Sequence, residues 1–347
     1  MEITIVTDAD PHKQMVGGVY NYVNYITRHL KRKGFIVQII GRMRQQREHK
    51  ITEYDRFIGI ESSNNYVFLL KLLRFFFMDI NSDVIYSQRA DFMLPFIFKK
   101  SRKVVAYHGT PSIEITHKKG FLIGLIYRII EKIVIKKCDK IIVVSSKTKE
   151  ALGKRHGVSA KIEILPIGVD LKIFRPKSKM ATRKKYGFNS KDKIALYVGR
   201  FSEEKQIDFI VQEIAKLKDV KLVLVGEGKI SVRLGKNTTL LEPVKHEYLA
   251  DIINCADCLV MFSKYEGMPT VILEALACAK PVVSSDVGDI SKVIIKDKTG
   301  FIAKEQDFGL CVQKAISNSQ KYKNACIKMA RDYSWDKITN KLVEMIK

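Results

Sequence analysis

Two carboxylates flank a Gly-x-Pro turn: Glu266 precedes it, and Glu274 lies eight residues further along the chain. Pro269 has no amide hydrogen and a fixed φ angle, which suits the first turn of a helix, and the pattern predicts a helix from Thr270 to Ala279. Free amides at the start of such a helix attract phosphate. Because the neighbours of Glu274 along this helix are apolar, its ionised carboxylate needs hydrogen-bond partners.

A cis-diol would supply those partners, because one carboxylate can accept hydrogen bonds from both hydroxyls. A ribose next to a helix-bound diphosphate presents such a diol. The alternative is that Glu274 is structural and pairs with Lys or Arg in a buried network. The segment thus favours a nucleotide-sugar site at this turn and leaves the structural alternative open.

Two cations precede this segment in the chain. Gly199 and Arg200 follow an apolar run from Ile194 to Val198, and Lys205 stands at the start of a predicted helix over residues 206–217. Two cations at one helix entrance suit a diphosphate and would neutralise its charge as it departs. On surface loops, however, Arg and Lys are commonly solvated without any ligand.

The first half of the chain offers weaker signals. His108 closes the run KVVAYHG, where a histidine can either meet a ligand or serve as a core or capping residue. Gly17 and Gly18 precede a predicted helix from Val19 to Lys33 and could let a phosphate approach the backbone.

The elements that must position these residues alternate between apolar strands and helices, which predicts parallel sheets covered by helices on both faces. Strands are predicted at Glu2–Thr7, Phe35–Ile40, Val84–Ser87, Lys103–Tyr107 and Lys140–Val144, and again at Ile194–Val198, Lys221–Val225, Cys258–Phe262 and Pro281–Ser284. The fold class is therefore α/β, with two Rossmann-like doubly wound domains. We expect residues 1–175 to form the first domain, 176–330 the second, and 331–347 to cross back onto the first.

Composition narrows the class of protein. The 347 residues are 46% hydrophobic, which is typical of a globular chain with room for two cores. The six cysteines fall within apolar patterns and no secretory leader is predicted, so we expect reduced thiols in the cytoplasm. Cys255 and Cys258 form a CxxC with no second metal-ligating pair at the required spacing. No apolar run is long enough to span a bilayer.

The chain is strongly basic, with 61 Lys and Arg against 37 Asp and Glu, a net charge of +24. Residues 1–175 hold 31 of the basic and 16 of the acidic residues, so most of the excess lies there. A cationic face can meet an anionic bilayer or nucleic acid, or be merely solvated. Two segments with interleaved apolar and basic residues, Val67–Met78 and Lys118–Lys137, favour the bilayer, although both could be core-facing helices with basic outer faces.

Taken together, these motifs resemble the retaining GT-B glycosyltransferases of family 4. The resemblance spans nearly the whole chain. The segments that carry the resemblance are the Gly17-Gly18 loop, the HG at His108, IGVDLKIFRP, GRFSEEKQ, VGEG, the paired Glu266 and Glu274, the stretch from Asp286 to Phe301, and the terminal YSWDKI.

The resemblance implies a role for each matched residue. Arg200 and Lys205 would hold the donor diphosphate beside Gly199, Pro269 and Thr270, and Glu274 would hold the ribose. Glu266 would orient the donor sugar together with the amides of Gly267 and Met268. His108 would contact the sugar near the scissile bond, and Gly17 and Gly18 would approach the diphosphate or the acceptor.

The activity this implies is sugar transfer from a nucleoside-diphosphate sugar, with retention, to a lipid-linked or membrane-surface glycan. The enzyme would work at the inner face of the cytoplasmic membrane, bind an anionic membrane surface and bind no nucleic acid. Asp8-Ala9-Asp10 mimics a metal-binding motif of another glycosyltransferase fold, yet it lies in the loop leading to Gly17, so we expect neither metal nor cofactor. A soluble acceptor, sugar-nucleotide epimerisation and a basic nucleic-acid-binding protein are the alternatives.

Overall fold

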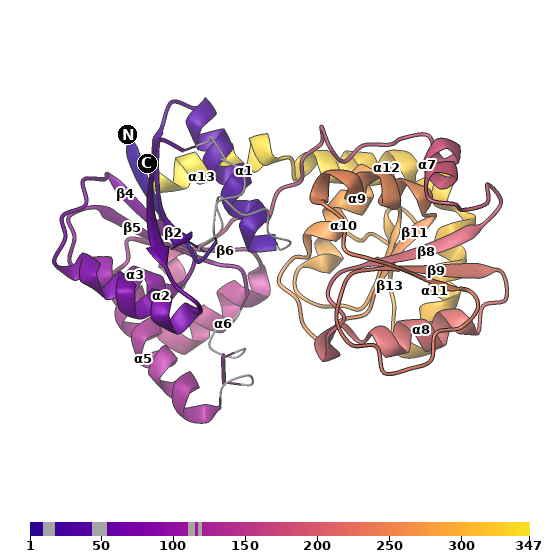
Figure 1. Ribbon diagram of the computed structural model, residues 1–347, viewed down its shortest axis with the longest axis horizontal. Coiled ribbons are helices and arrows are strands. Elements are labelled where there is room, and N and C mark those ends of the chain that lie inside the picture. The colour runs from indigo at the N-terminus through magenta and orange to yellow at the C-terminus, as the bar shows by residue number, and fades with distance from the viewer. Residues whose placement is uncertain (10–17, 44–53, 110–114, 117–119) are drawn as a thin grey trace. The chain divides into compact units, whose positions relative to one another are not determined.

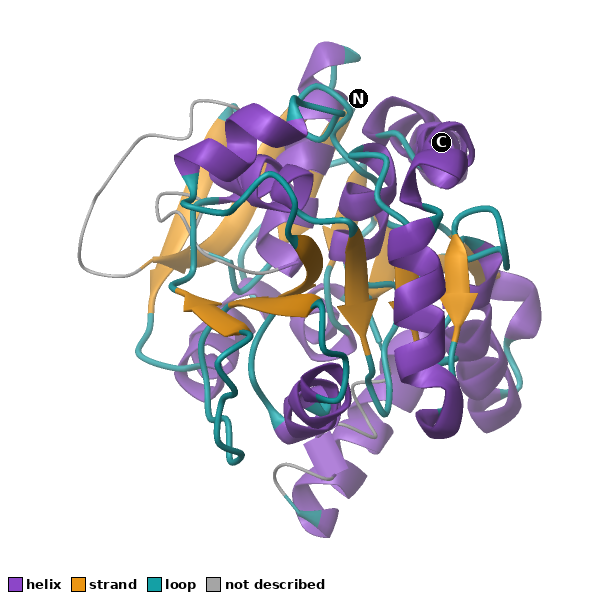
Figure 2. Cartoon of the chain, turned by 90° about the vertical axis from the view of Figure 1, so that its right-hand side faces the viewer, coloured by secondary structure: helices purple, strands orange, loops and turns teal. Residues whose placement is uncertain are grey.

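The computed structural model describes residues 1–9, 18–43, 54–109, 115–116 and 120–347. Its chain divides into two compact units, residues 1–167 with 335–347 (unit 1) and residues 168–334 (unit 2). The borders expected from the sequence were 175/176 and 330/331. In each unit a parallel sheet lies between helices, as the orange strands and purple helices of Figure 2 show.

Unit 1 is built on a sheet of seven described strands in the order β3-β2-β1-β4-β5-β6-β7. The strands are β1 (Glu2–Val6), β2 (Ile36–Met43), β3 (Arg56–Glu61), β4 (Val84–Ser87), β5 (Arg102–Tyr107), β6 (Lys140–Val143) and β7 (Ile162–Ile164). The helices are α1 (Gly18–Arg32), α2 (Asn65–Leu72), α3 (Ala90–Met93), α5 (Phe121–Lys137), α6 (Ser146–His156) and α13 (Trp335–Ile346), with short 3-10 turns η1 (Leu73–Phe76), η2 (Leu94–Phe96) and η3 (Ser159–Lys161).

Helices cover both faces of this sheet. α1 packs against α13, whereas α2, α3 and α5 form the layer on the opposite face (Figure 1). Phe68, Leu72 and Phe75 from the predicted apolar-basic segment 67–78 are fully buried in the core beneath that layer. Leu70, Phe77 and Met78 of the same segment are 68, 93 and 43% exposed, so its apolar residues are divided between the core and the surface.

Unit 2 repeats the plan with six described strands in the order β10-β9-β8-β11-β12-β13. The strands are β8 (Lys193–Val198), β9 (Val220–Val225), β10 (Thr238–Leu241), β11 (Cys258–Met261), β12 (Val282–Ser284) and β13 (Gly300–Ile302). The helices are α7 (Lys179–Lys185), α8 (Ile207–Ala215), α9 (His246–Cys255), α10 (Thr270–Ala277), α11 (Phe308–Ser317) and α12 (Ser319–Asp332), with 3-10 turns η4 (Glu203–Lys205), η5 (Ile290–Lys292) and η6 (Glu305–Asp307).

All the strand pairs of both sheets are parallel, so every strand of a unit ends at the same edge of its sheet. The predicted doubly wound architecture is confirmed in both units. Loops that follow the strands of unit 2 therefore gather at one edge, which is where ligands of such sheets bind.

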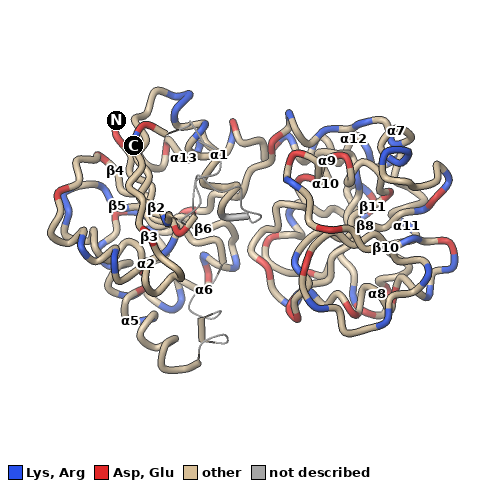
Figure 3. The backbone as a smooth tube through the Cα atoms, viewed as in Figure 1, with Lys and Arg blue, Asp and Glu red and all other residues tan. Residues whose placement is uncertain are grey.

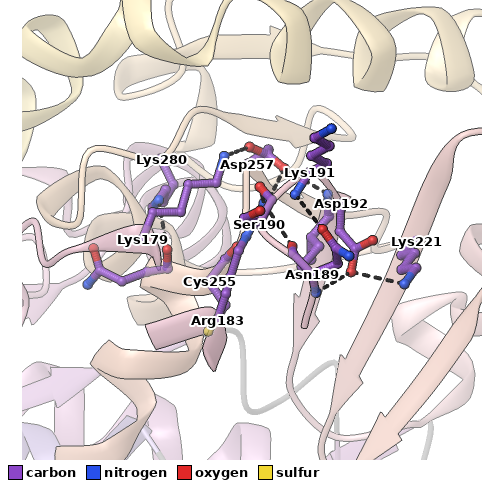
Figure 4. A network of polar contacts seen from close by, with 12 residues as sticks. Lys179, Arg183, Asn189, Ser190, Lys191, Asp192, Lys221, Cys255, Asp257 and Lys280 are labelled. Atoms are coloured by element: carbon purple, nitrogen blue, oxygen red, sulfur yellow. Dashed lines mark hydrogen bonds and ion pairs between the residues drawn. The ribbon is translucent and has the colours of Figure 1, made fainter. Parts of the chain in front are cut away.

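The opposite edge of unit 2 is held by a buried ion pair. The guanidinium of Arg183, on α7, donates to the carboxylate of Asp257 at 2.9 Å and to the carbonyl oxygens of Cys255 and Ser190 at 2.9 and 2.7 Å (Figure 4). The same carboxylate accepts from the amide of Ile194 at 2.8 Å. One guanidinium thus ties α7 to the starts of β8 and β11.

The six cysteines are all buried and unpaired, as expected. Burial raises the pKa of the Cys278 thiol to about 12, so that group is a thiol and not a thiolate near neutral pH. Within the described ranges, no helix combines the length and apolar character that a bilayer-spanning segment requires.

Candidate functional site

The loop after β8 carries the first predicted cations. The amide of Gly199 donates to the carbonyl of Val225 at 3.0 Å, and the amide of Phe201 donates to Glu227 at 2.7 Å, so the loop continues the pairing of β8 with β9. Arg200, between them, is exposed, and its guanidinium makes no hydrogen bond or ion pair with the residues that the structure describes. It is available to an anionic ligand at this edge.

Lys205 ends the turn η4 and does not begin the following helix. Gln206 has a φ of 48° in the left-handed region, so α8 starts only at Ile207. The helix thus starts one residue later than predicted, and Lys205 precedes its N-cap residue Gln206. The side chain of Lys205 leads across to the loop after β11.

There, the ammonium of Lys205 forms an ion pair with the Oε1 atom of Glu266. Ser263 donates its hydroxyl to the same oxygen at 3.1 Å, and only 13% of the Glu266 side chain is exposed. A lysine ammonium has three donors, so it can hold Glu266 and still offer hydrogen bonds to a phosphate. A predicted diphosphate-binding cation and a predicted sugar-binding carboxylate thus lie in direct contact.

The helix α10 begins at Thr270, with Pro269 as the preceding cap residue and no side-chain cap among the described residues. Pro269 thus stands just before the helix and not within its first turn. The amide of Ile272 donates to the carbonyl of Pro269 at 3.2 Å, which leaves the amides of Thr270 and Val271 for a phosphate. Met268, immediately before, is buried.

Glu274 lies within α10 and is 5% exposed. Its Oε1 atom accepts a hydrogen bond from the Nε2 atom of His246, the first residue of α9, at 2.7 Å. Burial would lower the pKa of His246, but the charge and hydrogen bond of Glu274 outweigh it, and the pKa is raised. The partner that Glu274 requires is therefore a histidine, which the analysis of the sequence did not single out.

The turn around Glu266 has a backbone neighbour. Gly288, after β12, has a φ of 56°, and a Cβ atom there would lie 2.0 Å from the carbonyl oxygen of Gly267. The amide of Asp289 donates to that same oxygen at 3.3 Å. The loop that carries Glu266 is thus backed directly by the backbone of the next loop along the sheet edge.

In unit 1, His108 follows β5 at the same kind of edge. Its Nε2 atom is hydrogen-bonded to Oε1 of Gln88, the residue after β4, and its ring meets the edge of Tyr22 with centroids 4.5 Å apart. Burial lowers the pKa of His108 to about 4, so the imidazole is neutral at pH 7. Gln88 and Tyr22 thus contact His108, and no sequence motif marks either residue.

The remaining predicted residues of unit 1 are placed only in part. Gly18 is the first residue of α1, whereas Gly17 and Asp10 lie outside the described residues. The carboxylate of Asp8 accepts from the side-chain Nδ2 atom of Asn65 at 3.0 Å. Within the described part of the chain, no group of three His, Cys, Asp or Glu residues could hold a metal ion.

These residues can stabilise a leaving diphosphate with cations and helix amides while two carboxylates hold hydroxyl groups. The comparison with protein families agrees with that arrangement. Residues 178–333 match the model described as glycosyl transferases group 1, and residues 16–173 match glycosyltransferase family 4. The chain belongs to these glycosyltransferase families.

Curated members of the family match over part of their length. A D-inositol 3-phosphate glycosyltransferase of Mycobacteroides abscessus is 25% identical over 232 residues, which cover 61% of this chain and 52% of that protein. A candidate teichuronic acid biosynthesis glycosyltransferase of Bacillus subtilis, TuaC, is 36% identical over 160 residues, 45% of this chain and 41% of its own. The chain thus spans about half the length of the curated relatives it matches.

Solved structures of glycosyltransferases share the fold over nearly the whole chain. The sucrose-phosphate synthase of Thermosynechococcus elongatus has a TM-score of 0.83 at 21% identity, covering 99% of this chain and 97% of its own. HepE of Anabaena, solved in complex with UDP, has a TM-score of 0.78 at 15% identity, covering 99% of both chains. The GT-B fold expected from the sequence is confirmed.

Proposed function

We propose that this protein is a retaining glycosyltransferase that moves a sugar from a nucleoside-diphosphate sugar to a lipid-linked or membrane-surface glycan. The observation that carries the proposal is the contact between Lys205 and Glu266 beside the start of α10. It brings a cation for the leaving group and a carboxylate for sugar hydroxyls to the edge of the sheet where such ligands bind. The UDP complex of HepE, which has the same fold, is consistent with this class of donor.

The charges suggest how the residues would act. As the bond to the diphosphate breaks, the sugar carbon becomes cationic and the leaving group gains negative charge. Lys205, Arg200 and the amides at the start of α10 would stabilise that charge more strongly in the transition state than in the ground state, which is the condition for catalysis. His108 is neutral at pH 7 and can donate or accept a hydrogen bond, but it carries no charge.

Glu274 would hold the ribose. Its Oε1 atom is bound to His246, and its Oε2 atom has no partner among the described residues. One oxygen therefore remains for a ribose hydroxyl while His246 fixes the carboxylate through the other. Cations, helix amides and carboxylates fill the proposed roles without a metal ion, and we propose metal-independent transfer.

The acceptor and place of action complete the proposal. TuaC is named for teichuronic acid biosynthesis, which favours a cell-surface glycan over a soluble acceptor. The basic excess of residues 1–175 favours work at an anionic membrane surface, and the cytoplasmic leaflet carries such a negative surface potential. Nucleic acid is not part of the proposal.

A thermal-shift panel of UDP-, GDP-, ADP- and CDP-sugars tests the donor class, because a ligand that binds only the folded state raises the melting temperature. One nucleotide series should raise it in the wild type and raise it less in Lys205→Ala. Lys264→Ala is the matched control, since Lys264 lies in the same loop region but is exposed and pairs with Glu203. No shift with any nucleotide sugar would overturn the proposal.

A further inference from the structure

The helix α5 has an apolar row on the side that faces away from the core. Leu122, Ile126, Ile129 and Ile133 (the outer row) follow the spacing i, i+4, i+7, i+11 and are 74, 59, 54 and 43% exposed. Globular helices normally place polar residues on that side. Here the side opposite the buried residues is the more apolar part of the exposed surface.

The orientation of α5 is fixed by charge as well as by packing. Glu131, the helix's acidic residue, is fully buried, and its Oε2 atom lies 3.0 Å from Nε2 of His156 and 3.6 Å from Arg155 on α6. Turning the outer row toward the core would break this ion pair. The outward position of the row is therefore a property of the fold.

Basic residues border the outer row. Arg128, Lys132 and Lys136 (the cationic row) follow one another at intervals of four, and Lys137 lies on the opposite side of the outer row. The first two turns carry no charge, and they are tan in Figure 3. Like charges at intervals of four destabilise a helix unless anions compensate them.

We propose that α5 is an interfacial helix, which lies in the plane of an anionic bilayer with its outer row among the acyl chains and its cationic row at the phosphates. This matches the pattern of membrane-surface helices, an apolar side bordered by Lys and Arg. A second copy of the chain fits less well, because the exposed side of α5 offers no carboxylate to meet a partner's cations. The role of α5 as a membrane anchor rests on the proposed function at a membrane surface. Vesicle binding by α5 can nevertheless be tested without any sugar transfer.

Co-sedimentation of the full chain with phosphatidylglycerol and with phosphatidylcholine vesicles is the first measurement. The triple variant Leu122→Ser, Ile126→Ser, Ile129→Ser should bind phosphatidylglycerol about tenfold more weakly or worse, at low and high salt alike. Its matched control is Met180→Ser, Leu240→Ser, Leu310→Ser, which removes three exposed apolar side chains of unit 2. The control should bind as the wild type does.

The cationic row is tested by salt. Arg128→Gln, Lys132→Gln, Lys136→Gln should weaken binding at low salt and have little effect at high salt, where the Debye length is only a few ångström. The control is the triple variant Lys218→Gln, Lys314→Gln, Lys328→Gln, which removes the same number of positive charges from exposed positions of unit 2. Equal losses in variant and control would mean a diffuse charge effect and would overturn the specific role of α5.

Depth is measured by placing an indole on the outer row. In Ile129→Trp, vesicles with brominated acyl chains should quench the new fluorescence, whereas native Trp335 is buried and serves as an unquenched background. Unchanged nucleotide binding in solution would show that the serine variants are folded and that the donor site is separate. The inference fails if wild type stays in the supernatant, if the indole is not quenched, or if wild type is a dimer that the outer-row variant converts to a monomer.

Discussion

Glu274 is buried and is hydrogen-bonded to His246, which can gain or lose a proton. These two properties affect nucleotide binding and the pH dependence of stability. Because its Oε1 atom is held by His246, the carboxylate has a defined orientation within α10. A hydrogen bond to a charged group contributes about 1.5–3 kcal/mol. The affinity for the nucleotide should therefore depend strongly on the charge of Glu274.

Glu274→Gln should weaken binding of the preferred nucleoside diphosphate by about tenfold or more while leaving the fold intact. The amide keeps the size of the side chain but has one acceptor oxygen in place of two, so it cannot accept from His246 at one position and from a ribose hydroxyl at the other. Isothermal titration calorimetry measures the change, with the exposed Glu305→Gln as control. Equal affinity in Glu274→Gln and wild type would assign Glu274 a structural role only.

The partner of Glu274 makes stability depend on pH. The pKa of His246 is raised in the folded state, so its contribution to stability is complete below the unfolded pKa of about 6.5 and is lost as pH rises through the folded value. The stability difference between wild type and His246→Gln should therefore shrink as pH rises above about 6.5. Urea unfolding of both proteins across this range measures it, and a difference independent of pH would contradict the assignment.

At the scale of elements, the loop carrying Glu266 is held from behind by the left-handed turn at Gly288. Gly288→Ala adds a Cβ atom that must displace the backbone of Gly267, and the left-handed φ adds strain. We expect weaker nucleotide binding with a smaller loss of melting temperature than a core variant shows. Gly309→Ala is the matched control, since its Cβ would meet only ordinary contact, and it should leave binding unchanged.

The other edge of the same sheet depends on Arg183. Arg183→Ala leaves Asp257 buried with one fewer cation and frees the carbonyls of Cys255 and Ser190. Removing one partner of a buried pair costs about 3–5 kcal/mol. Thermal unfolding should show a clear loss of stability, and Lys184→Ala on the exposed side of α7 should show little. Lys179 also forms an ion pair with Asp257. Unchanged stability in Arg183→Ala would mean that Lys179 alone satisfies this carboxylate.

For the whole molecule, the sequence predicts most of the architecture because buried parallel strands are continuous apolar runs. Four strands, β3, β7, β10 and β13, were not predicted from the sequence, and all four are edge strands. Runs such as RFIGIE and TTLL are only partly buried. Their place in the sheet comes from pairing with a neighbour, which no local pattern records.

The candidate site was predictable to a similar extent. Glu266, Lys205 and Glu274 carry spacing signals because each is tied to a strand end or a helix. The contact of Lys205 with Glu266 joins positions 61 residues apart, and His246 reaches Glu274 across 28. Such partners follow from the order of strands in the sheet. The left-handed Gln206 only delays the start of α8 by one residue from the prediction.

Metal dependence is a property of the whole reaction. Because the proposed charge stabilisation uses cations and helix amides, transfer should survive exhaustive EDTA treatment. Initial rates before and after chelation, with and without added magnesium or manganese, make the comparison. Loss of activity that either ion restores would return attention to Asp8 and its surroundings.

The helix α13 belongs to unit 1, although it follows unit 2 in the sequence. Trp335 of α13 stacks on Tyr25 with ring centroids 5.1 Å apart and meets the edge of Tyr22, both on α1. Unit 2 is contiguous in sequence, whereas unit 1 is interrupted by it. During synthesis on the ribosome, we therefore expect unit 2 to complete its fold before unit 1 does. Unit 1 must wait, with the aromatic side of α1 uncovered and accessible to chaperones, until residues 335–347 leave the exit tunnel.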